Sequence, residues 1–274
     1  MRQSEGRLGG KVAIVTGAGT KDAGVGTGRA TSLVFAREGA KVLLVDLVPE
    51  NAEKTLTAIQ EEGGEASVFM ADVSSSADCQ AMVEAAVERY GALHVLFNNV
   101  GIGGPGSVTD MDEAVWDRVL DVNLKSMALT SKYAIPKMIQ SGGGSIINVS
   151  SIDGLRAGVW RNIPYAAAKG GVIALTKNMA VHHGRDNIRV NCIAPGHIYT
   201  PMVSDHLSEE LRDLRRRAAP LGTEGTAWDV AWAALFLASD ESRWMSGVVL
   251  PIDAGLLATT PLSMLPHLQM ANDE

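Results

Sequence analysis

The sequence predicts an α/β fold in which helices cover both faces of a doubly wound parallel sheet. Short apolar runs rich in β-branched residues alternate with longer helical patterns along the 274 residues. The runs are almost continuously apolar, which is typical of parallel strands that are buried on both faces. A glycine-rich turn links the first run to the first helical pattern. Strands that alternate with helices favour right-handed βαβ units, and such units build a doubly wound sheet.

Seven strands and six helices account for most of the chain. The strands are predicted over Lys11–Thr16, Lys41–Asp46, Ala66–Met70, Val95–Asn98, Ser145–Val149, Ile188–Cys192 and Val248–Ile252. The helices are predicted over Gly28–Glu38, Glu50–Glu62, Ser75–Tyr90, Met111–Ser141, Tyr165–His183 and Thr226–Ser239. No linker or repeat interrupts this order. We therefore expect one domain over residues 1–255 and a C-terminal tail over residues 256–274.

Composition excludes several classes of function. The chain is 46% hydrophobic and 20% charged, with a formal net charge of -7, which makes nucleic acid and anionic membranes poor partners. Its two cysteines form no disulfide framework and fit a reducing, cytoplasmic compartment. No apolar run reaches the roughly 18 residues of a membrane span. We expect no bound metal.

The first strand leads into the glycine-rich turn. Gly17 follows the strand, and Gly26 and Gly28 open the next helix. Glycines let a pyrophosphate approach the backbone, and a helix N-terminus supplies free N–H groups and the positive end of its dipole. The turn therefore predicts a dinucleotide site. A merely flexible turn is the plainer alternative.

The second strand ends at Asp46. A carboxylate there accepts hydrogen bonds from ribose hydroxyls and repels a 2′-phosphate, so it favours NAD over NADP. An ordinary turn aspartate is the alternative. Lys21, inside the glycine-rich turn, is the one charge that argues for NADP.

Polar and small residues follow the third and fourth strands. Asp72 and Val73 come after the third strand, and Asn99 and Gly101 after the fourth. Open α/β sheets bind ligands at these carboxyl ends. The spacing is equally consistent with a role for Asp72 as the N-cap of the next helix.

The fifth strand and the helix after it carry the candidate chemistry. Ser150 and Ser151 end the strand, and Tyr165 and Lys169 lie four residues apart on one helix face. An ammonium group beside a phenol favours the phenolate and lowers the pKa of the tyrosine, which would suit proton transfer near neutral pH. The alternative is a buried tyrosine with a snorkelling lysine.

Pro195 and Gly196 end the sixth strand, and a charged helical pattern follows within residues 200–221. We expect this segment to close over a substrate. The run Arg215–Arg217 is interpreted as a solvated helix face.

Taken in order, these motifs resemble the short-chain dehydrogenase/reductase family, in its compact single-domain branch. The match covers about residues 8 to 255. The motifs are Thr16-Gly17…Gly26-x-Gly28, Asp72-Val73, Asn98-Asn99-x-Gly101, Asn123, Ser151, Tyr165-x-x-x-Lys169, Pro195-Gly196 and Thr200. The resemblance implies a Rossmann-type sheet of seven strands, a nicotinamide cofactor, and reversible oxidation of an alcohol to a carbonyl.

The resemblance also implies residue roles. Tyr165 would exchange a proton with the substrate oxygen, which Ser151 would hold. Lys169 would lower the pKa of Tyr165 and bind the nicotinamide ribose, and Asn123 would support a water. The implied cofactor contacts are Gly17, Gly26, Gly28, Asp46, Asp72, Val73, Asn99, Gly101, Tyr165, Lys169, Pro195, Gly196, Ile198 and Thr200.

Three departures from the family pattern stand out. The turn from Gly17 to Gly26 is longer than usual, so Thr20–Val25 look inserted and the role of each glycine is uncertain. Val100 replaces the usual alanine. His94 replaces an acidic residue at the start of the fourth strand and is interpreted as structural.

The sequence thus predicts an NAD-dependent oxidoreductase that interconverts a secondary alcohol and a ketone, as a homotetramer. Gly101–Gly106, Ile152–Pro164 and Thr200–Leu221 should line the substrate pocket, with Trp160 as a candidate wall. A regulator that binds NAD without turnover is one alternative. Enoyl reduction is another, although those relatives separate their tyrosine and lysine by more residues.

Overall fold

All seven predicted strands form, and they make one parallel sheet. The computed structural model describes residues 6–20, 24–158, 160–204 and 207–269. The strands of this sheet are β1 Val12–Thr16, β2 Lys41–Asp46, β3 Glu65–Met70, β4 Val95–Asn98, β5 Gly144–Val149, β6 Ile188–Pro195 and β9 Val249–Ile252. Their spatial order is β3-β2-β1-β4-β5-β6-β9, and every pairing is parallel. The predicted doubly wound α/β fold is confirmed.

The order of the strands determines where a ligand-binding crevice can form at the sheet. From β1 the chain winds outward to β2 and β3, then returns to β4 on the other side of β1. Loops at the carboxyl ends of β1 and β4 therefore diverge, and open α/β sheets bind ligands at such a switch point. The glycine-rich turn follows β1 at this point.

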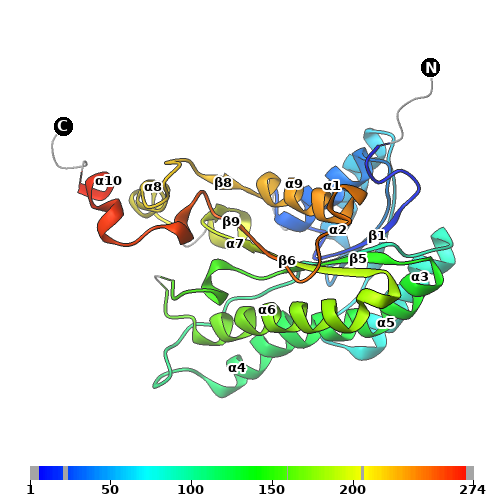
Figure 1. Ribbon diagram of the computed structural model, residues 1–274, viewed down its shortest axis with the longest axis horizontal. Helices are drawn as coiled ribbons and strands as arrows, with labels where there is room; N and C mark the ends of the chain where they lie inside the picture. The colour runs from blue at the N-terminus through cyan, green and yellow to red at the C-terminus, as the bar shows by residue number, and fades with distance from the viewer. Residues whose placement is uncertain (1–5, 21–23, 159, 205–206, 270–274) are drawn as a thin grey trace.

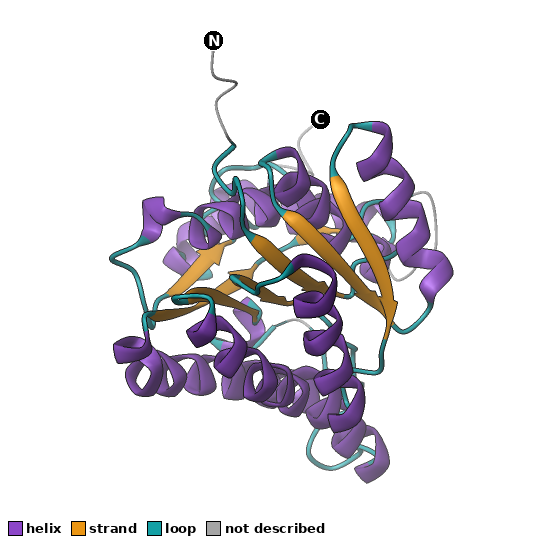
Figure 2. Ribbon diagram, turned by 90° about the vertical axis from the view of Figure 1, so that its right-hand side faces the viewer, coloured by secondary structure: helices purple, strands orange, loops and turns teal. Residues whose placement is uncertain are grey.

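Two helical layers cover the sheet. The helices that flank it are α1 Thr27–Arg37, α2 Pro49–Glu61, α3 Ser76–Tyr90, α4 Glu113–Leu120, α5 Ser126–Gln140, α6 Ile163–His183 and α9 Ala227–Ala238. One core packs α1, α2 and α9 against one face, and a second packs α3, α5 and α6 against the other. Figure 1 shows these layers above and below the strands, and Figure 2 shows the sheet enclosed between them.

Local signals set the helix ends. The Ser75 hydroxyl accepts from Asp78 N at the start of α3, and Gly91 ends that helix in the left-handed region. Thr226 and Asp229 form a reciprocal capping box at the start of α9. These caps supply hydrogen bonds that the helix termini lack.

The long helix predicted over residues 111–141 differs in one respect. It consists of α4 and α5, joined by a π-helical segment over Asp121–Lys125. Periodicity cannot reveal such a segment, because it adds a single residue to one turn of an otherwise continuous helix. The segment carries Asn123.

The segment after β6 contains a smaller unit. It comprises β7 Ile198–Tyr199, α7 Pro201–Ser204, α8 Glu209–Arg217 and β8 Gly225–Thr226, and β7 pairs with β8. The predicted charged helix is therefore α8.

The tail beyond Gly255 docks on the same chain. It forms two 3₁₀ turns, Leu256–Ala258 and Leu262–Met264, and then α10 Leu265–Gln269. Leu256 and Met264 are buried, and Arg217 donates to the Leu268 carbonyl across 3.1 Å. Figure 1 shows α10 beside α8. None of the described helices is long and apolar enough to cross a membrane.

Candidate active site

Close backbone approach shapes the glycine-rich turn. Gly17 has a φ of +63°, a region that favours glycine. A methyl group on Gly28 would lie 1.9 Å from the Gly17 carbonyl oxygen. Both glycines are therefore required by the fold of the turn itself.

Gly26 differs from the other two glycines. It N-caps α1 without a side-chain cap, and a methyl group there would find its nearest neighbour, Gly19 O, at 3.9 Å. The start of α1 thus has unoccupied N–H groups beside open space, which is the arrangement that binds a phosphate.

Two polar atoms around this turn lack partners. Thr20 Oγ1 and Arg29 Nε are buried with no hydrogen-bond partner among the described residues. Unpaired buried donors are rare in proteins, and they fit a site that holds a polar ligand. The cradle at Gly26 and these two donors suit a dinucleotide pyrophosphate. Lys21, the predicted argument for NADP, lies outside the described residues.

Asp46 lies at the end of β2, beside the turn. One carboxylate oxygen accepts from Gly19 N at 2.9 Å and the other from Val48 N at 3.0 Å. These bonds hold the carboxylate beside the turn, and each oxygen keeps a second lone pair for a ligand.

The residues after β3 and β4 take separate structural roles. Asp72 accepts from the Ser74 N–H and hydroxyl, and these bonds hold its pKa below the ordinary value. The alternative that Asp72 caps α3 is wrong, because Ser75 is the N-cap. Asn99 Nδ2 donates to Thr16 O at 3.1 Å and so ties the end of β4 to the turn.

The two serines after β5 point to different partners. Ser150 donates to the Lys169 carbonyl at 2.7 Å and is buried. The Ser151 hydroxyl accepts from Asp153 N at 3.1 Å, and it also interacts with the phenol of Tyr165 and lowers its pKa. Of the pair, Ser151 is therefore the serine that faces Tyr165.

Lys169 is fully enclosed by protein. Its Nζ donates to the Val149 carbonyl at 2.8 Å and lies 5.5 Å from the centre of the Tyr165 ring. Burial lowers the pKa of Lys169 to about 8, because an ammonium group loses hydration there.

The expectation that the pKa of Tyr165 is lowered is wrong. Tyr165 keeps part of its surface in solvent, yet burial raises its pKa to about 12, and the charge of Asp153 adds to this shift. The Ser151 hydroxyl opposes it. The Lys169 ammonium group, which donates to the Val149 carbonyl and lies 5.5 Å from the centre of the ring, does not offset the effect of burial.

Gly101 lies close to the Lys169 ammonium group and to the Asn123 side chain. Asn123 accepts from Ile102 N at 2.8 Å and donates to Ile102 O at 2.9 Å. A methyl group on Gly101 would lie 3.3 Å from Lys169 Nζ and 3.6 Å from Asn123 Oδ1. The structure thus brings Asn123, Gly101, Lys169, Tyr165 and Ser151 together.

The end of β6 adds a backbone wall. Gly196 N donates to Ile252 O, and Ile198 N donates to Gly196 O, both at 2.8 Å. A methyl group on Gly196 would lie 2.7 Å from Asp253 Cα, so only glycine fits here. Thr200 stands directly before α7, whose Pro201 approaches Gly24 of the glycine-rich turn.

Comparisons with known proteins agree with this geometry. A family model described as enoyl-(acyl carrier protein) reductase matches residues 21–257. The uncharacterized oxidoreductase YxbG of Bacillus subtilis is 40% identical over 263 residues, which cover 93% of this chain and 94% of that protein. The chain belongs to the short-chain dehydrogenase/reductase family.

Solved structures of short-chain dehydrogenases and reductases superpose closely. Levodione reductase has a TM-score of 0.86 and 35% identity, over 92% of this chain and all of its own. A 7α-hydroxysteroid dehydrogenase, solved with NADH and 7-oxo glycochenodeoxycholic acid, has a TM-score of 0.85 and 33% identity, over 93% of this chain and 98% of its own. Family membership makes this chain an oxidoreductase of a group that uses NAD or NADP.

His197, beside the short-chain dehydrogenase/reductase site, was not predicted from the sequence. His197 Nδ1 contacts the Arg215 carbonyl at 3.2 Å, and burial lowers the pKa of its ring. Since a carbonyl only accepts, Nδ1 carries the proton. Its position in the sequence, directly after Gly196, could have indicated that it lies beside the site. Trp160, the predicted pocket wall, is 49% exposed.

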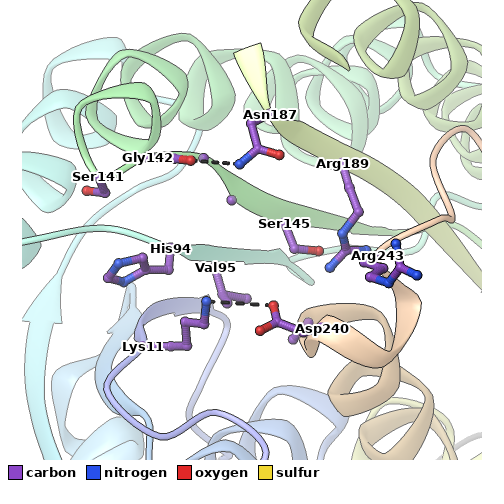
Figure 3. Close-up of a pocket in the computed structure, with 13 residues that line it drawn as sticks. Lys11, His94, Val95, Ser141, Gly142, Ser145, Asn187, Arg189, Asp240 and Arg243 are labelled. Carbon is purple, nitrogen blue, oxygen red and sulfur yellow. Dashed lines mark hydrogen bonds and ion pairs between the residues drawn. The ribbon is translucent and has the colours of Figure 1, made fainter. Parts of the chain in front are cut away.

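A cavity of about 240 Å³ lies at the amino ends of β4, β5 and β6, at the opposite end of the strands from the candidate active site (Figure 3). It contains Lys11, paired with Asp240 at 3.7 Å, and Arg189, bonded to the Leu237 carbonyl. His94 lies here too and accepts from Val12 N, as expected of a structural histidine. Tyr165 and Lys169 are not among its lining residues, so this cavity is separate from the candidate active site.

Proposed function

We propose that the protein is an NAD-dependent dehydrogenase that interconverts a secondary alcohol and a ketone. The observation that carries the proposal is the convergence of Ser151, Tyr165 and Lys169 at the edge of the sheet where the glycine-rich turn lies. The hydroxysteroid dehydrogenase relative, solved with NADH and an oxo compound, supports this chemistry by likeness. The proposed enzyme is a cytoplasmic homotetramer with a single catalytic domain over residues 1–255.

The residues divide the work as follows. The nicotinamide ring, when bound, accepts or donates the hydride. Tyr165, whose pKa lies at about 12, is protonated at neutral pH and so donates its proton to a developing alkoxide during ketone reduction. Ser151 holds the same oxygen by a hydrogen bond. Lys169, whose Nζ lies 5.5 Å from the centre of the Tyr165 ring, has a pKa of about 8 and replenishes the proton.

The remaining cofactor contacts follow from position. Gly17, Gly26 and Gly28 place the backbone against the pyrophosphate. Asp46 takes the ribose hydroxyls. We propose that the cofactor is also contacted by residues at the carboxyl ends of the strands: Asp72, Val73, Asn99, Gly101, Pro195, Gly196, Ile198 and Thr200. Asn123 orders the backbone next to Lys169 through its bonds to Ile102.

Replacing Tyr165 by Phe tests the proposed reaction. With secondary alcohols as substrates, Tyr165→Phe should lose at least about 100-fold in kcat, because general acid–base catalysis contributes on this scale. NAD affinity, measured by calorimetry, should stay within about threefold. Tyr133→Phe is the matched control, since the Tyr133 hydroxyl bonds to Ser76 at an exposed position. Full activity of Tyr165→Phe would overturn the proposed function.

Replacing Asp46 by Ser tests the cofactor preference. The carboxylate should repel the 2′-phosphate of NADP, so Asp46→Ser should reduce the ratio of kcat/KM for NAD to that for NADP by about 10-fold or more. Equal efficiency of the unaltered protein with both cofactors would show that Asp46 does not select NAD.

A further inference from the structure

The four arginines of α8 do not share one environment. Arg212 makes a bidentate pair with Glu224 at 2.7 and 2.5 Å and stacks 3.9 Å from the centre of the Tyr199 ring. Arg216 and Arg217 both pair with Asp213. The Arg215 guanidinium has no ion pair or hydrogen bond to any described residue. The prediction of a solvated helix face is confirmed for Arg216, which is exposed, whereas Arg215 and Arg217 are partly buried.

Arg215 is also the arginine of α8 whose charge is desolvated. Its side chain is half-buried, and burial lowers the pKa of its guanidinium. Two carboxylates act on it through space, Glu224 and Asp153. Glu224 is occupied by Arg212, and Asp153 accepts from Asn162 Nδ2 at 2.9 Å. A half-buried charge without a paired counter-ion is unfavourable unless a ligand supplies one.

Packing places Arg215 beside the candidate active site. Ile152, the residue after Ser151, packs with Ala219 and Leu256 in one buried cluster. The Arg215 carbonyl contacts His197, which directly follows the Pro195-Gly196 turn. Asp153, two residues after Ser151, acts through its charge on the pKa of both Tyr165 and Arg215.

A second cation without a partner stands in the same region. Arg156 follows the 3₁₀ turn Ile152–Gly154 and is exposed, and its guanidinium makes no ion pair or hydrogen bond to a described residue. Its charge acts on His197 together with that of Arg215. Arginine recognises carboxylates and other oxyanions with a planar fork of donors.

We infer that Arg215, assisted by Arg156, binds an anionic oxygen group of the substrate, so that the substrate is a secondary hydroxy acid or the matching oxo acid. The inference rests on the proposed dehydrogenase function and adds the substrate class to it. The carbinol carbon faces Tyr165 and Ser151, while the anionic group lies toward α8. Arg215 is thus a specificity-determining residue.

The test uses straight-chain secondary hydroxy acids of increasing length, each beside its uncharged methyl ester. We would measure kcat/KM for NAD reduction with each hydroxy pair, and calorimetric binding of the matching oxo acids and oxo esters to the protein with NAD, where no hydride is available for turnover. The best acid should exceed its ester by about 10- to 100-fold in both measurements, the range of a hydrogen bond to a charged group. Arg215→Gln should remove this preference and leave the ester within about threefold.

Matched variants separate charge recognition from structural damage. Arg216→Gln, next to Arg215 but paired with Asp213, should keep the full preference. Arg215→Lys should retain part of it, since the charge remains and the fork is lost. Arg156→Gln should reduce the preference less than Arg215→Gln does.

Two outcomes would overturn the inference. One is equal binding of acid and ester in every pair by the unaltered protein, and the other is an undiminished preference in Arg215→Gln. If acid binding depends on Arg215 while no alcohol yields NADH, the anion site stands and the proposed dehydrogenase function fails. The two proposals are therefore distinguishable.

Discussion

Lys169 serves the proposed reaction but lowers the stability of the fold. Its ammonium group is buried against the Val149 carbonyl, and no carboxylate of the described residues pairs with it. Burial lowers its pKa from 10.5 to about 8, so the folded chain releases a proton that the unfolded chain would keep. Such a group destabilises the fold at neutral pH, and the penalty disappears once the lysine is neutral in both states.

Replacing Lys169 by Met should therefore stabilise the fold and abolish activity. Below pH 8 both states of the unaltered chain carry the charge, and the gain should be largest there, at most about 3 kcal/mol. Between pH 8 and 10.5 the unfolded state binds more protons, so the unaltered chain gains stability and the difference shrinks. Urea unfolding at several pH values measures it.

Lys125→Met is the control for this series. Lys125 is exposed and pairs with Asp121, so its removal should change the free energy of unfolding by less than about 1 kcal/mol at every pH. A Lys169→Met variant that is less stable than the unaltered chain at pH 7 would show that the Val149 hydrogen bond outweighs desolvation.

Spacing predicted which catalytic candidates meet, but it did not predict their electrostatics. The four-residue step correctly placed Tyr165 and Lys169 on one face of α6. The direction of the Tyr165 pKa shift depends on burial and on the nearby Ser151 and Asp153, and spacing encodes none of these. For the same reason the run of arginines at 215–217 concealed that one of them lacks a counter-ion.

At the scale of elements, the tail supports α8. Leu256 is 3% exposed and packs with Ile152 and Ala219, which join the turn after Ser151 to the end of α8. The sequence showed apolar residues in the tail without a helical period, so it left open what they would cover. The partner is distant in sequence, and only the folded chain reveals it.

Leu256→Ala should loosen this support. A buried leucine truncated to alanine typically lowers the free energy of unfolding by about 2–5 kcal/mol, and we expect the low end because the cluster is small. The KM for substrate should rise by about threefold or more, as α8 loses its fixed position. Chemical unfolding and steady-state kinetics measure these effects.

Leu262→Ala is the matched control in the same tail. Leu262 is 79% exposed, so both stability and KM should stay essentially unchanged. If Leu256→Ala and Leu262→Ala behave alike, the tail does not position α8.

At the scale of the whole molecule, large apolar side chains remain exposed on α6, on α9 and in the turn before β9. Trp244, in the turn before β9, is 91% exposed, Val181 on α6 is 77% exposed and Trp232 on α9 is 50% exposed. Exposed apolar side chains of this size often mark an interface between subunits. We expect the four copies to pair through the helices predicted over Met111–Ser141 and Tyr165–His183 and through the last strands. Val181 lies on α6, within the second of these helices, and Trp244 lies before β9.

Trp244→Asp should weaken that assembly. Light scattering should give the unaltered protein the mass of four 28.9 kDa chains, and Trp244→Asp should shift it toward smaller species, because a charge replaces a desolvated anchor. Trp160→Asp, on the substrate side, should keep the larger mass. A monomer at micromolar concentration would contradict the proposed homotetramer.

The placement of the two chain ends has a practical consequence. Near the start of the chain, Arg7 pairs with Glu241 and Leu8 N donates to Glu38 O, whereas α10 at the other end rests against α8 (Figure 1). A purification tag fused after α10 would therefore hang beside the helix that bears Arg215. Affinity constants intended for comparison between laboratories are best obtained with the tag placed at Met1.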